Sequence, residues 1–354
     1  MSSYLKNAWY AAAWSSEVGR ALFKRVIMDQ AVLLFRKEDG AAAALGNRCP
    51  HRFGPLDQGK LEGDTVACPY HGLRFDASGK CVFNPNGNQV VPPGARVRTY
   101  PLVERHGVLW IWPGDPVQAE PASIPDLSYL EDSAHYARVN GLLEVRANYR
   151  YIIDNLVDGA HVATVHHDTL ACDSFTRAKP EVRVEGDTVW SRLICPPGHP
   201  SAIWEKLWEA SNGPVTGPMD FWADSGWTPG AIIMQDTGMM GQGRPRSEGL
   251  RTLNCHLLTP ETETSTHYFW AICRDFARDD EELSRNMKMG AEYTFTQQDA
   301  VILAAIQDSA GNEDFWEMKP CLLPDDVAAV KVRRRMDELL KAEHEAAAGE
   351  RRAA

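Results

Sequence analysis

Residues 49–72 of the chain read CPHRFGPLDQGKLEGDTVACPYHG. This stretch places Cys49 and His51 in one loop and Cys68 and His71 in a second, so each loop offers one sulfur and one nitrogen to a metal. Glycine and proline flank both pairs, and these residues favour rigid turns whose backbone N–H groups can face a bound group. The spacing therefore predicts one metal site built from two similar loops.

Two kinds of metal site use this set of ligands. Structural zinc sites are tetrahedral, usually with two to four residues between paired ligands, whereas a single residue separates Cys49 from His51. In a Rieske [2Fe–2S] cluster two cysteines bind one iron and two histidines bind the other, so that each loop bridges both irons. The pattern favours the cluster, and zinc or unrelated core residues are the weaker alternatives.

Length and charge limit the class of protein. A chain of 354 residues favours two domains, and a net charge of −11 argues against nucleic acid as a partner, because phosphate binding needs clustered lysine and arginine. Of the eight cysteines, those outside the two loops are widely scattered, which indicates buried thiols in a reducing compartment. No apolar run is long enough to span a membrane, and we expect a cytoplasmic protein.

The hydrophobic pattern divides the chain into two parts. From residue 25 to Trp112 short apolar runs alternate with turns, as in a small all-β domain with the metal site at one tip. The proline-rich segment 113–128 shows no periodicity, so we place the domains at 1–118 and 119–354. The second part mixes strand-like and helical segments, which predicts an α+β fold. Hairpin turns are expected at Lys37–Gly40, Asp76–Gly79, Arg105–Gly107 and Glu185–Asp187, a hairpin over 251–276 and a long helix over 281–309.

A second metal site is suggested by NLVDGAHVATVH, residues 155–166. His161 and His166 would lie roughly 140° apart on an ideal helix, so they share a face only if the helix is distorted near Gly159. Asp299 lies in an otherwise apolar helical stretch, where a carboxylate is costly to bury unless it is paired or bound to metal. Two histidines and one carboxylate form the facial triad of non-haem iron oxygenases. The alternatives are core histidines and an aspartate on an exposed helix face.

Tracts along nearly the whole chain resemble the Rieske non-haem iron oxygenase family, in its oxygenase (α) subunit. They lie closest to the branch that contains vanillate O-demethylase and dicamba monooxygenase. The resemblance implies a small all-β Rieske domain followed by a larger α+β catalytic domain, with an antiparallel sheet and helices in a helix-grip-like arrangement. The tracts are KNAWY (6–10), CPHRFGPL (49–56), CPYHGLRFD (68–76), WIWPGDP (110–116), DNLVDGAHVATVH (154–166) and LLTPETETSTHYFW (257–270).

The resemblance also implies roles for single residues. Asp158 would be the carboxylate that carries electrons between a cluster histidine of one subunit and an iron histidine of the next, and Asn155 would lie beside the iron without binding it. His256 would contact a carboxylate on the substrate, although a strand histidine facing solvent or core is an equal alternative. The implied ligands are Cys49, His51, Cys68 and His71 for the cluster, and His161, His166 and Asp299 for one mononuclear Fe(II).

The activity implied by the resemblance is O₂-dependent O-demethylation of a methoxylated aromatic, expected to bear a carboxylate, which gives a phenol and formaldehyde. Methyl-group or ring hydroxylation of an aromatic acid or sulfonate is the alternative within enzymes, and a Rieske electron-transfer protein is the alternative outside them. The chain has no flavin or dinucleotide fingerprint, since GMMGQG at 238–243 lacks the spacing and the βαβ context. Electrons from NAD(P)H would arrive through a separate reductase, with or without a ferredoxin, and the family members resembled are homotrimers.

One long segment departs from the family pattern. Residues 196–250 do not align comfortably with the relatives named, and in the family this region forms much of the substrate pocket. Its four tryptophans suit a flat apolar ring but equally suit a core. Substrate identity is therefore the inference that the sequence supports least.

Overall fold

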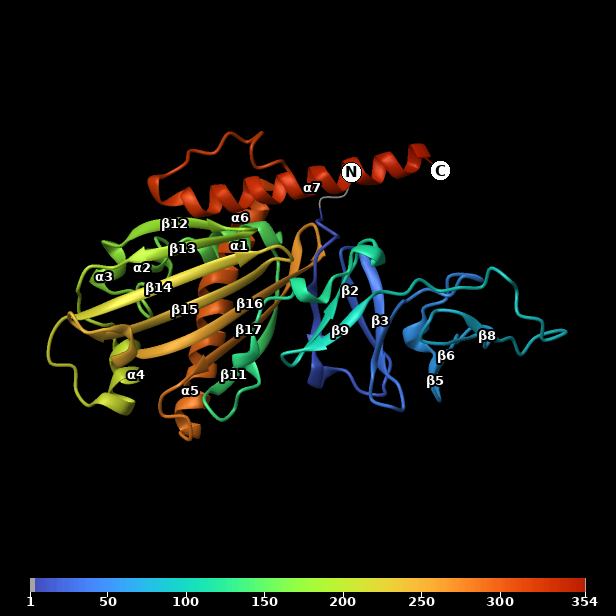
Figure 1. Ribbon diagram of the computed structural model, residues 1–354, viewed down its shortest axis with the longest axis horizontal. Helices are drawn as coiled ribbons and strands as arrows, with labels where there is room; N and C mark the ends of the chain where they lie inside the picture. The colour runs from blue at the N-terminus through green and yellow to red at the C-terminus, as the bar shows by residue number, and fades with distance from the viewer. Residues whose placement is uncertain (1–3, 354) are drawn as a thin grey trace. The chain divides into compact units, whose positions relative to one another are not determined.

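The computed structural model describes residues 4–353 and divides the chain into two compact units. One unit is Lys6–Ile124, and the other runs from Pro125 onward and includes Tyr4 and Leu5. Figure 1 labels the elements of both. The boundary predicted after residue 118 falls a little before this division, in the same proline-rich segment, and stays a prediction.

The Lys6–Ile124 unit is built from short antiparallel strands, which confirms the expected all-β fold. Each predicted hairpin turn in this unit joins two paired strands, and His106 and Gly107 have the positive φ angles (58° and 71°) that a tight two-residue turn requires. Over the described residues the sheets are β1 (Tyr10–Trp14), β10 (Val108–Ile111) and β9 (Leu102–Arg105); β2 (Phe23–Ile27), β3 (Gln30–Arg36) and β4 (Ala42–Gly46); and β5 (Lys60–Glu62), β6 (Thr65–Ala67), β7 (Arg74–Phe75) and β8 (Cys81–Phe83).

The larger unit is organised around one antiparallel sheet in the order β11-β17-β16-β15-β14-β13-β12. The hairpin predicted over 251–276 is β16 paired with β17, and the turn predicted at Glu185–Asp187 joins β12 to β13. The strands are β11 (Ala137–Val145), β12 (Lys179–Glu185), β13 (Thr188–Ile194), β14 (Met219–Thr228), β15 (Ile232–Gly241), β16 (Leu250–Thr262) and β17 (Ser265–Arg274).

Helices pack against this sheet, so the α+β fold is confirmed. α1 contacts the middle strands, α5 and α6 contact the edge strand β11, and α7 contacts β12 and β13. No helix within residues 4–353 is both long and apolar enough to cross a membrane. The helices are α1 (Tyr149–Val157), α2 (Val162–Val165), α3 (Asp173–Thr176), α4 (Ala202–Asn212), α5 (Glu281–Tyr293), α6 (Ala300–Ala310) and α7 (Val327–Ala353).

The predicted long helix over 281–309 is interrupted. Between α5 and α6 the backbone forms a π-helix over Thr294–Asp299, which widens the turn. Asp299 is the last residue of this segment and is buried. Single-turn π segments are frequent at functional sites, so this irregularity marks the position of a carboxylate that an ordinary helix would have aimed elsewhere.

A buried ion pair fastens α7 to α1. Arg333 donates from Nε and Nη2 to both oxygens of Asp154 at 2.6 to 3.0 Å, and its guanidinium stacks on the Phe315 ring at 3.8 Å. The Arg333 side chain is only 4% exposed. Because α1 also leads into the segment that carries His161, this contact holds the base of the second predicted site.

Removing the buried member of this pair should destabilise the larger unit. Arg333→Met leaves Asp154 without its cation, and we expect the free energy of unfolding to fall by about 3 kcal/mol. Arg335 is the control, because its side chain is 36% exposed where it pairs with Asp187, and Arg335→Met should cost less than about 1 kcal/mol. Urea unfolding of the two variants with equal metal content measures both values, and equal losses would contradict the assignment.

Candidate metal centres and active site

The two predicted cluster loops have the same backbone structure. The N–H of Cys49 donates to the carbonyl of Gly54 at 2.9 Å and its carbonyl accepts from the N–H of Phe53 at 2.9 Å. Cys68 repeats both bonds, with Leu73 at 2.8 Å and Gly72 at 3.0 Å. Phe53 and Gly72 occupy the same position in their loops and both have a positive φ, 60° and 71°. The loops therefore form a matched pair around one site.

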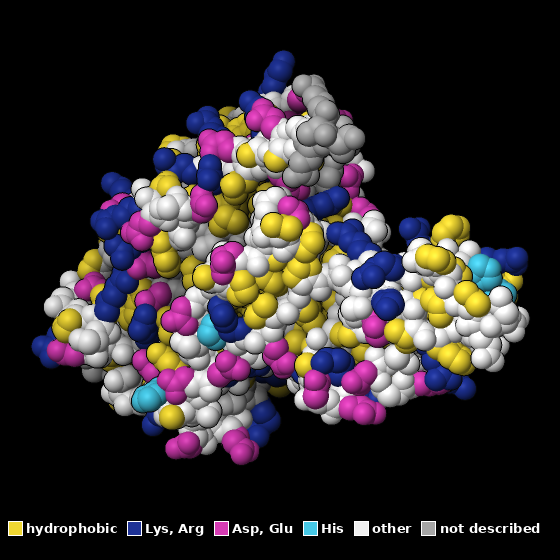
Figure 2. Space-filling view, turned by 45° about the vertical axis from the view of Figure 1, so that its right-hand side comes forward, with side chains coloured by type: hydrophobic (Ala, Val, Ile, Leu, Met, Phe, Trp, Pro, Cys, Tyr) yellow, Lys and Arg dark blue, Asp and Glu magenta, His cyan; other side chains and the backbone are white. Residues whose placement is uncertain are grey.

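The polarity of this site fits a Rieske cluster. Cys49 and Cys68 belong to the hydrophobic core of the unit, whereas His51 is exposed and lies 4.5 Å from the His71 ring, centroid to centroid. Figure 2 shows histidine at the surface of this end of the unit, among hydrophobic side chains. Burial raises the pKa of the Cys49 thiol to about 11, so a thiolate there needs an adjacent cation, which iron supplies. These four residues suit one buried and one outer iron.

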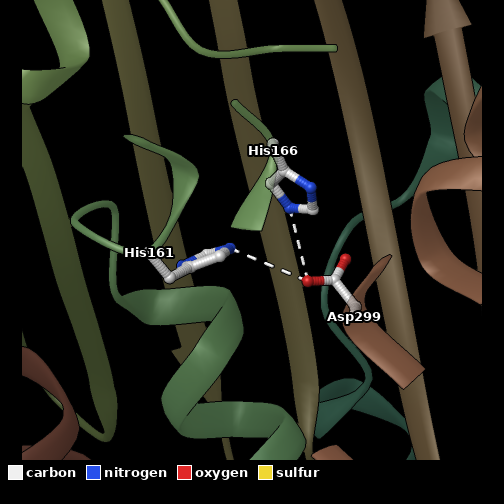
Figure 3. Close-up of side chains that lie close together, drawn as sticks. All are labelled: His161, His166 and Asp299. Carbon is white, nitrogen blue, oxygen red and sulfur yellow. Dashed lines mark ion pairs between the residues drawn. The ribbon is translucent and has the colours of Figure 1, made fainter. Parts of the chain in front are cut away.

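The second predicted site is brought together in the larger unit. Asp299 Oδ1 lies 3.3 Å from Nε2 of His166 and 3.9 Å from Nε2 of His161, and the ligand atoms of the three residues all lie within 4.8 Å of one another (Figure 3). His166 and Asp299 are buried. Two imidazoles and a carboxylate facing one point form the donor set of a non-haem iron site with open positions, so the residues fit the predicted metal.

The two histidines lie at opposite ends of the short helix α2, and His166 has already left helical geometry (φ −107°, ψ 28°), which resolves the spacing problem in the sequence. Helix α1 ends at Val157, and the short helix α2 separates His161 at its start from His166 at its end. The break falls at Asp158–Ala160, where the Asp158 carboxylate accepts the N–H of Ala160 at 2.7 Å. The expected distortion near Gly159 is therefore a change of helix.

The orientation of His166 is set by a chain of polar contacts that the sequence analysis did not identify. Gln298 donates from Nε2 to Asp168 at 2.6 Å, so its Oε1 faces His166 Nδ1 at 2.8 Å and accepts from it. Thr169 donates to the same oxygen at 3.0 Å. With the proton on Nδ1, Nε2 keeps its lone pair toward Asp299 and is ready to bind a metal.

Two further residues surround the site. Asn155 donates from Nδ2 to Asp299 Oδ1 at 3.2 Å, which places it beside the site as predicted. Asp158 Oδ2 lies 3.6 Å from Nδ1 of His161, a nitrogen that is buried without a hydrogen-bond partner. Burial opposes ionisation of Asp158, but the nearby His161 ring and hydrogen bonds from the backbone N–H groups of Ala160 and His161 outweigh it and lower the pKa. Asp158 is therefore anionic and adjacent to the ligand side chain.

A cavity of about 630 Å³ opens at the three residues. Its walls are mostly apolar and include Trp204 and Leu207 of α4 and Phe295 of the π-helix. The segment 196–250, whose role the sequence left open, supplies α4, β14 and β15 to these walls, whereas Trp222 and Trp227 are buried in the core. A cavity of this size suits a small organic ligand.

His256 also lines the cavity, but both of its ring nitrogens are bonded within the protein. Gln235 donates from Nε2 to the Leu156 carbonyl at 3.1 Å and to Ser225 at 3.0 Å, so its Oε1 accepts from His256 Nε2 at 2.8 Å. Tyr268 then donates its hydroxyl to Nδ1 at 2.7 Å. Burial lowers the pKa of His256 to about 4, and the imidazole is neutral at physiological pH.

Replacing Gln298 should weaken metal binding at the triad without affecting the cluster loops. Gln298→Met keeps the side-chain length but removes the acceptor for His166 Nδ1, and we expect iron affinity at this site to fall roughly 10- to 100-fold. Gln297→Met is the matched control, because Gln297 is exposed and its Nε2 donates to Thr296 Oγ1 at 3.4 Å in the same helix. Titration of the protein with iron measures the affinity of the triad, and the visible spectrum of the cluster shows separately whether the cluster loops remain filled. Equal affinity in both variants would show that Gln298 does not orient the ligand.

Comparison with known families agrees with this geometry. Residues 8–101 match the Rieske [2Fe–2S] domain, and residues 145–342 match the vanillate O-demethylase oxygenase C-terminal domain. The first match covers the paired loops, and the second covers His161, His166 and Asp299. Both predicted domains therefore belong to known families.

Whole-chain relatives give the same result. The chain is 41% identical to the oxygenase component of chloroacetanilide N-alkylformylase from Rhizorhabdus wittichii, over 96% of this chain and 97% of that one. It is 37% identical to the dicamba O-demethylase oxygenase component of Stenotrophomonas maltophilia, over 95% and 98%. A crystal structure of dicamba monooxygenase with 3,6-dichlorosalicylic acid superposes with a TM-score of 0.89 at 36% identity, over 96% and 99%. The chain thus belongs to the Rieske non-haem iron oxygenases, as an oxygenase component of the vanillate O-demethylase type.

Proposed function

We propose that the chain catalyses O₂-dependent O-demethylation of a methoxylated aromatic, with a phenol and formaldehyde as products. The observation that carries the proposal is the His161, His166 and Asp299 group at the wall of an apolar cavity of about 630 Å³. As a member of its family the protein is a monooxygenase with a Rieske [2Fe–2S] cluster and a non-haem iron. Apolar walls suit an aromatic ring, and the three triad residues line the same cavity.

The residues divide into two sets of ligands. We assign the cluster to Cys49, His51, Cys68 and His71, and the mononuclear iron to His161, His166 and Asp299. When bound, the iron supplies the O₂ activation that oxidises an unactivated C–H bond. The chain holds the ring beside the triad and keeps water out of the apolar cavity, which fixes the carbon that reacts. A hydroxylated methoxy group then collapses to the phenol and formaldehyde.

We assign the electron route to Asp158. Its side chain is 27% exposed, so it can reach both His161 and a neighbouring chain, and its charge favours an N–H donor on either side. The proposed assembly is a cytoplasmic homotrimer in which Asp158 connects the cluster of one subunit to the iron of the next. Relatives named as oxygenase components work with separate partners. For this chain we propose a reductase that uses NAD(P)H, with or without a ferredoxin.

His256 was expected to contact a substrate carboxylate, and that role stays a prediction. Both of its ring nitrogens are engaged by Gln235 and Tyr268. Contact with a ligand would require His256 to release one of these partners. We propose instead that it supports the cavity wall and holds Gln235 in place.

A single-turnover assay tests the reaction itself. The protein is reduced chemically without oxygen, then mixed with O₂ and one candidate aromatic, and formaldehyde and hydroxylated products are quantified. We expect formaldehyde in step with a new phenol from a methoxyarene. A hydroxymethyl product from toluene-4-sulfonate, with no formaldehyde from any methoxyarene, would favour methyl hydroxylation. Cluster oxidation without product from a bound methoxyarene would contradict O-demethylation.

Asp158→Asn tests the electron route. The amide keeps the shape of the side chain but removes the charge beside His161, so we expect both metal sites to remain filled. Oxidation of the reduced cluster in the presence of substrate and O₂ should slow by roughly tenfold or more. Stopped-flow absorbance of the cluster measures this rate, and metal analysis provides the control. A rate equal to that of the wild type would show that electrons do not pass through Asp158.

A further inference from the structure

The cavity walls contain almost no positive charge. Within residues 4–349 no arginine lines the cavity, and Lys206 is the sole lysine that does. Lys206 lies on α4 and is exposed, so water screens its charge. The two carboxylates on the walls, Asp158 and Asp299, are committed to the metal site described above. An anionic group on a ligand would therefore be buried without a protein cation beside it, which is strongly unfavourable.

The neutral polar groups of the sheet cannot replace that cation. An anion is stabilised by free N–H or O–H donors, but the donors at the centre of the wall are already used. His256 donates to Gln235, and Gln235 donates to Leu156 and Ser225. Each bond joins two protein groups, so a carboxylate could bind to His256 or Gln235 only by breaking one of them. An unpartnered N–H remains at Trp204 Nε1 on α4, but this neutral donor does not replace a cation.

Within residues 4–349, three polar atoms of wall residues are buried without a hydrogen-bond partner: Nδ1 of His161, Nε1 of Trp204 and Oδ1 of Asn254. Asn254 Oδ1 is the acceptor among them that lies outside the metal site. Asn254 lies on β16, lines the cavity and is only 8% exposed. Its Nδ2 donates to Thr237 Oγ1 at 3.3 Å, whereas its Oδ1 is buried with no hydrogen bond. A buried acceptor left unpaired costs free energy, and this cost disappears when a ligand donates an N–H or O–H to it. A carboxylate has no hydrogen to donate, and its negative charge would face the partial negative charge of this amide oxygen.

From these contacts we propose that the cavity selects an uncharged aromatic ether whose second polar group is a hydrogen-bond donor, such as a carboxamide, and that Asn254 determines this selectivity. The proposal rests on the proposed function for the ether and names the substrate class of the same site. It assigns Asn254 Oδ1 as the acceptor for the ligand's N–H, with the apolar ring between α4 and the π-helix. Discrimination against acids follows from the lack, within residues 4–349, of an arginine or a buried lysine on the walls.

Three probes that share one ring and one methoxy group test the proposal: 2-methoxybenzamide, methyl 2-methoxybenzoate and 2-methoxybenzoate. The first is neutral with an N–H donor, the second is neutral without one, and the third is an anion at neutral pH. Calorimetric titration of the oxidised holoenzyme measures binding without turnover. We expect the amide to bind at least about tenfold more tightly than the acid, with the ester between them. Calorimetry measures only binding. A failure of this selectivity can therefore be distinguished from a failure to produce formaldehyde.

Two variants make the test specific. Asn254→Ala should weaken the amide about five- to tenfold, to the level of the ester, while unchanged ester binding shows that the cavity is intact. Lys206→Gln tests the opposing possibility that the exposed lysine recruits acids. The proposal is overturned if the acid binds as tightly as the amide in the wild type and loses that affinity in Lys206→Gln. It is also overturned if Asn254→Ala leaves amide binding unchanged, or if the amide does not bind more tightly than the acid.

Discussion

The burial of the Asp299 carboxylate is the constraint on which the catalytic unit depends. Asp299 is 4% exposed, and its nearest polar partners are Asn155 and the imidazoles of His161 and His166. A carboxylate is expensive to bury inside a protein unless a cation accompanies it. A divalent metal would supply that charge, and the three side chains offer it Nε2 of His161, Nε2 of His166 and an oxygen of Asp299. The π-helix that aims Asp299 inward and the short helix α2, which carries the two histidines at its ends, are irregularities that this arrangement requires.

The smaller unit uses two loops of the same backbone structure to carry its buried cysteines. Two loops with the same hydrogen bonds and the same positive φ position carry Cys49 and Cys68 into the hydrophobic core. The histidines two and three residues further along lie nearer the solvent. A cluster held in this way has one side in a low-dielectric core and the other accessible to an electron partner, which suits a carrier that must exchange electrons.

The sequence predicted much of this protein because its ligands lie close together in the chain. The spacing in CPH and CPYH was enough to identify the cluster loops, and alternation with turns was enough for the hairpins. Asp299 could be paired with two distant histidines only through a general rule about buried carboxylates and through the family resemblance. Contacts that are set by the register of paired strands could not be predicted from the sequence. Gln235 faces Asn254 across β15 and β16, and Gln298 reaches His166 only because a π-helix, which the helical pattern did not reveal, turns it inward.

The central claim is that a metal at His161, His166 and Asp299 faces the cavity where the substrate lies. The most direct measurement is electron paramagnetic resonance of the reduced protein with nitric oxide, which binds ferrous iron at an open position. The account predicts the ferrous nitrosyl signal in the wild type, its loss in Asp299→Ala with the cluster signal retained, and a shift when a methoxyarene is added. A nitrosyl signal that persists in Asp299→Ala, or one that no bound aromatic perturbs, would contradict it.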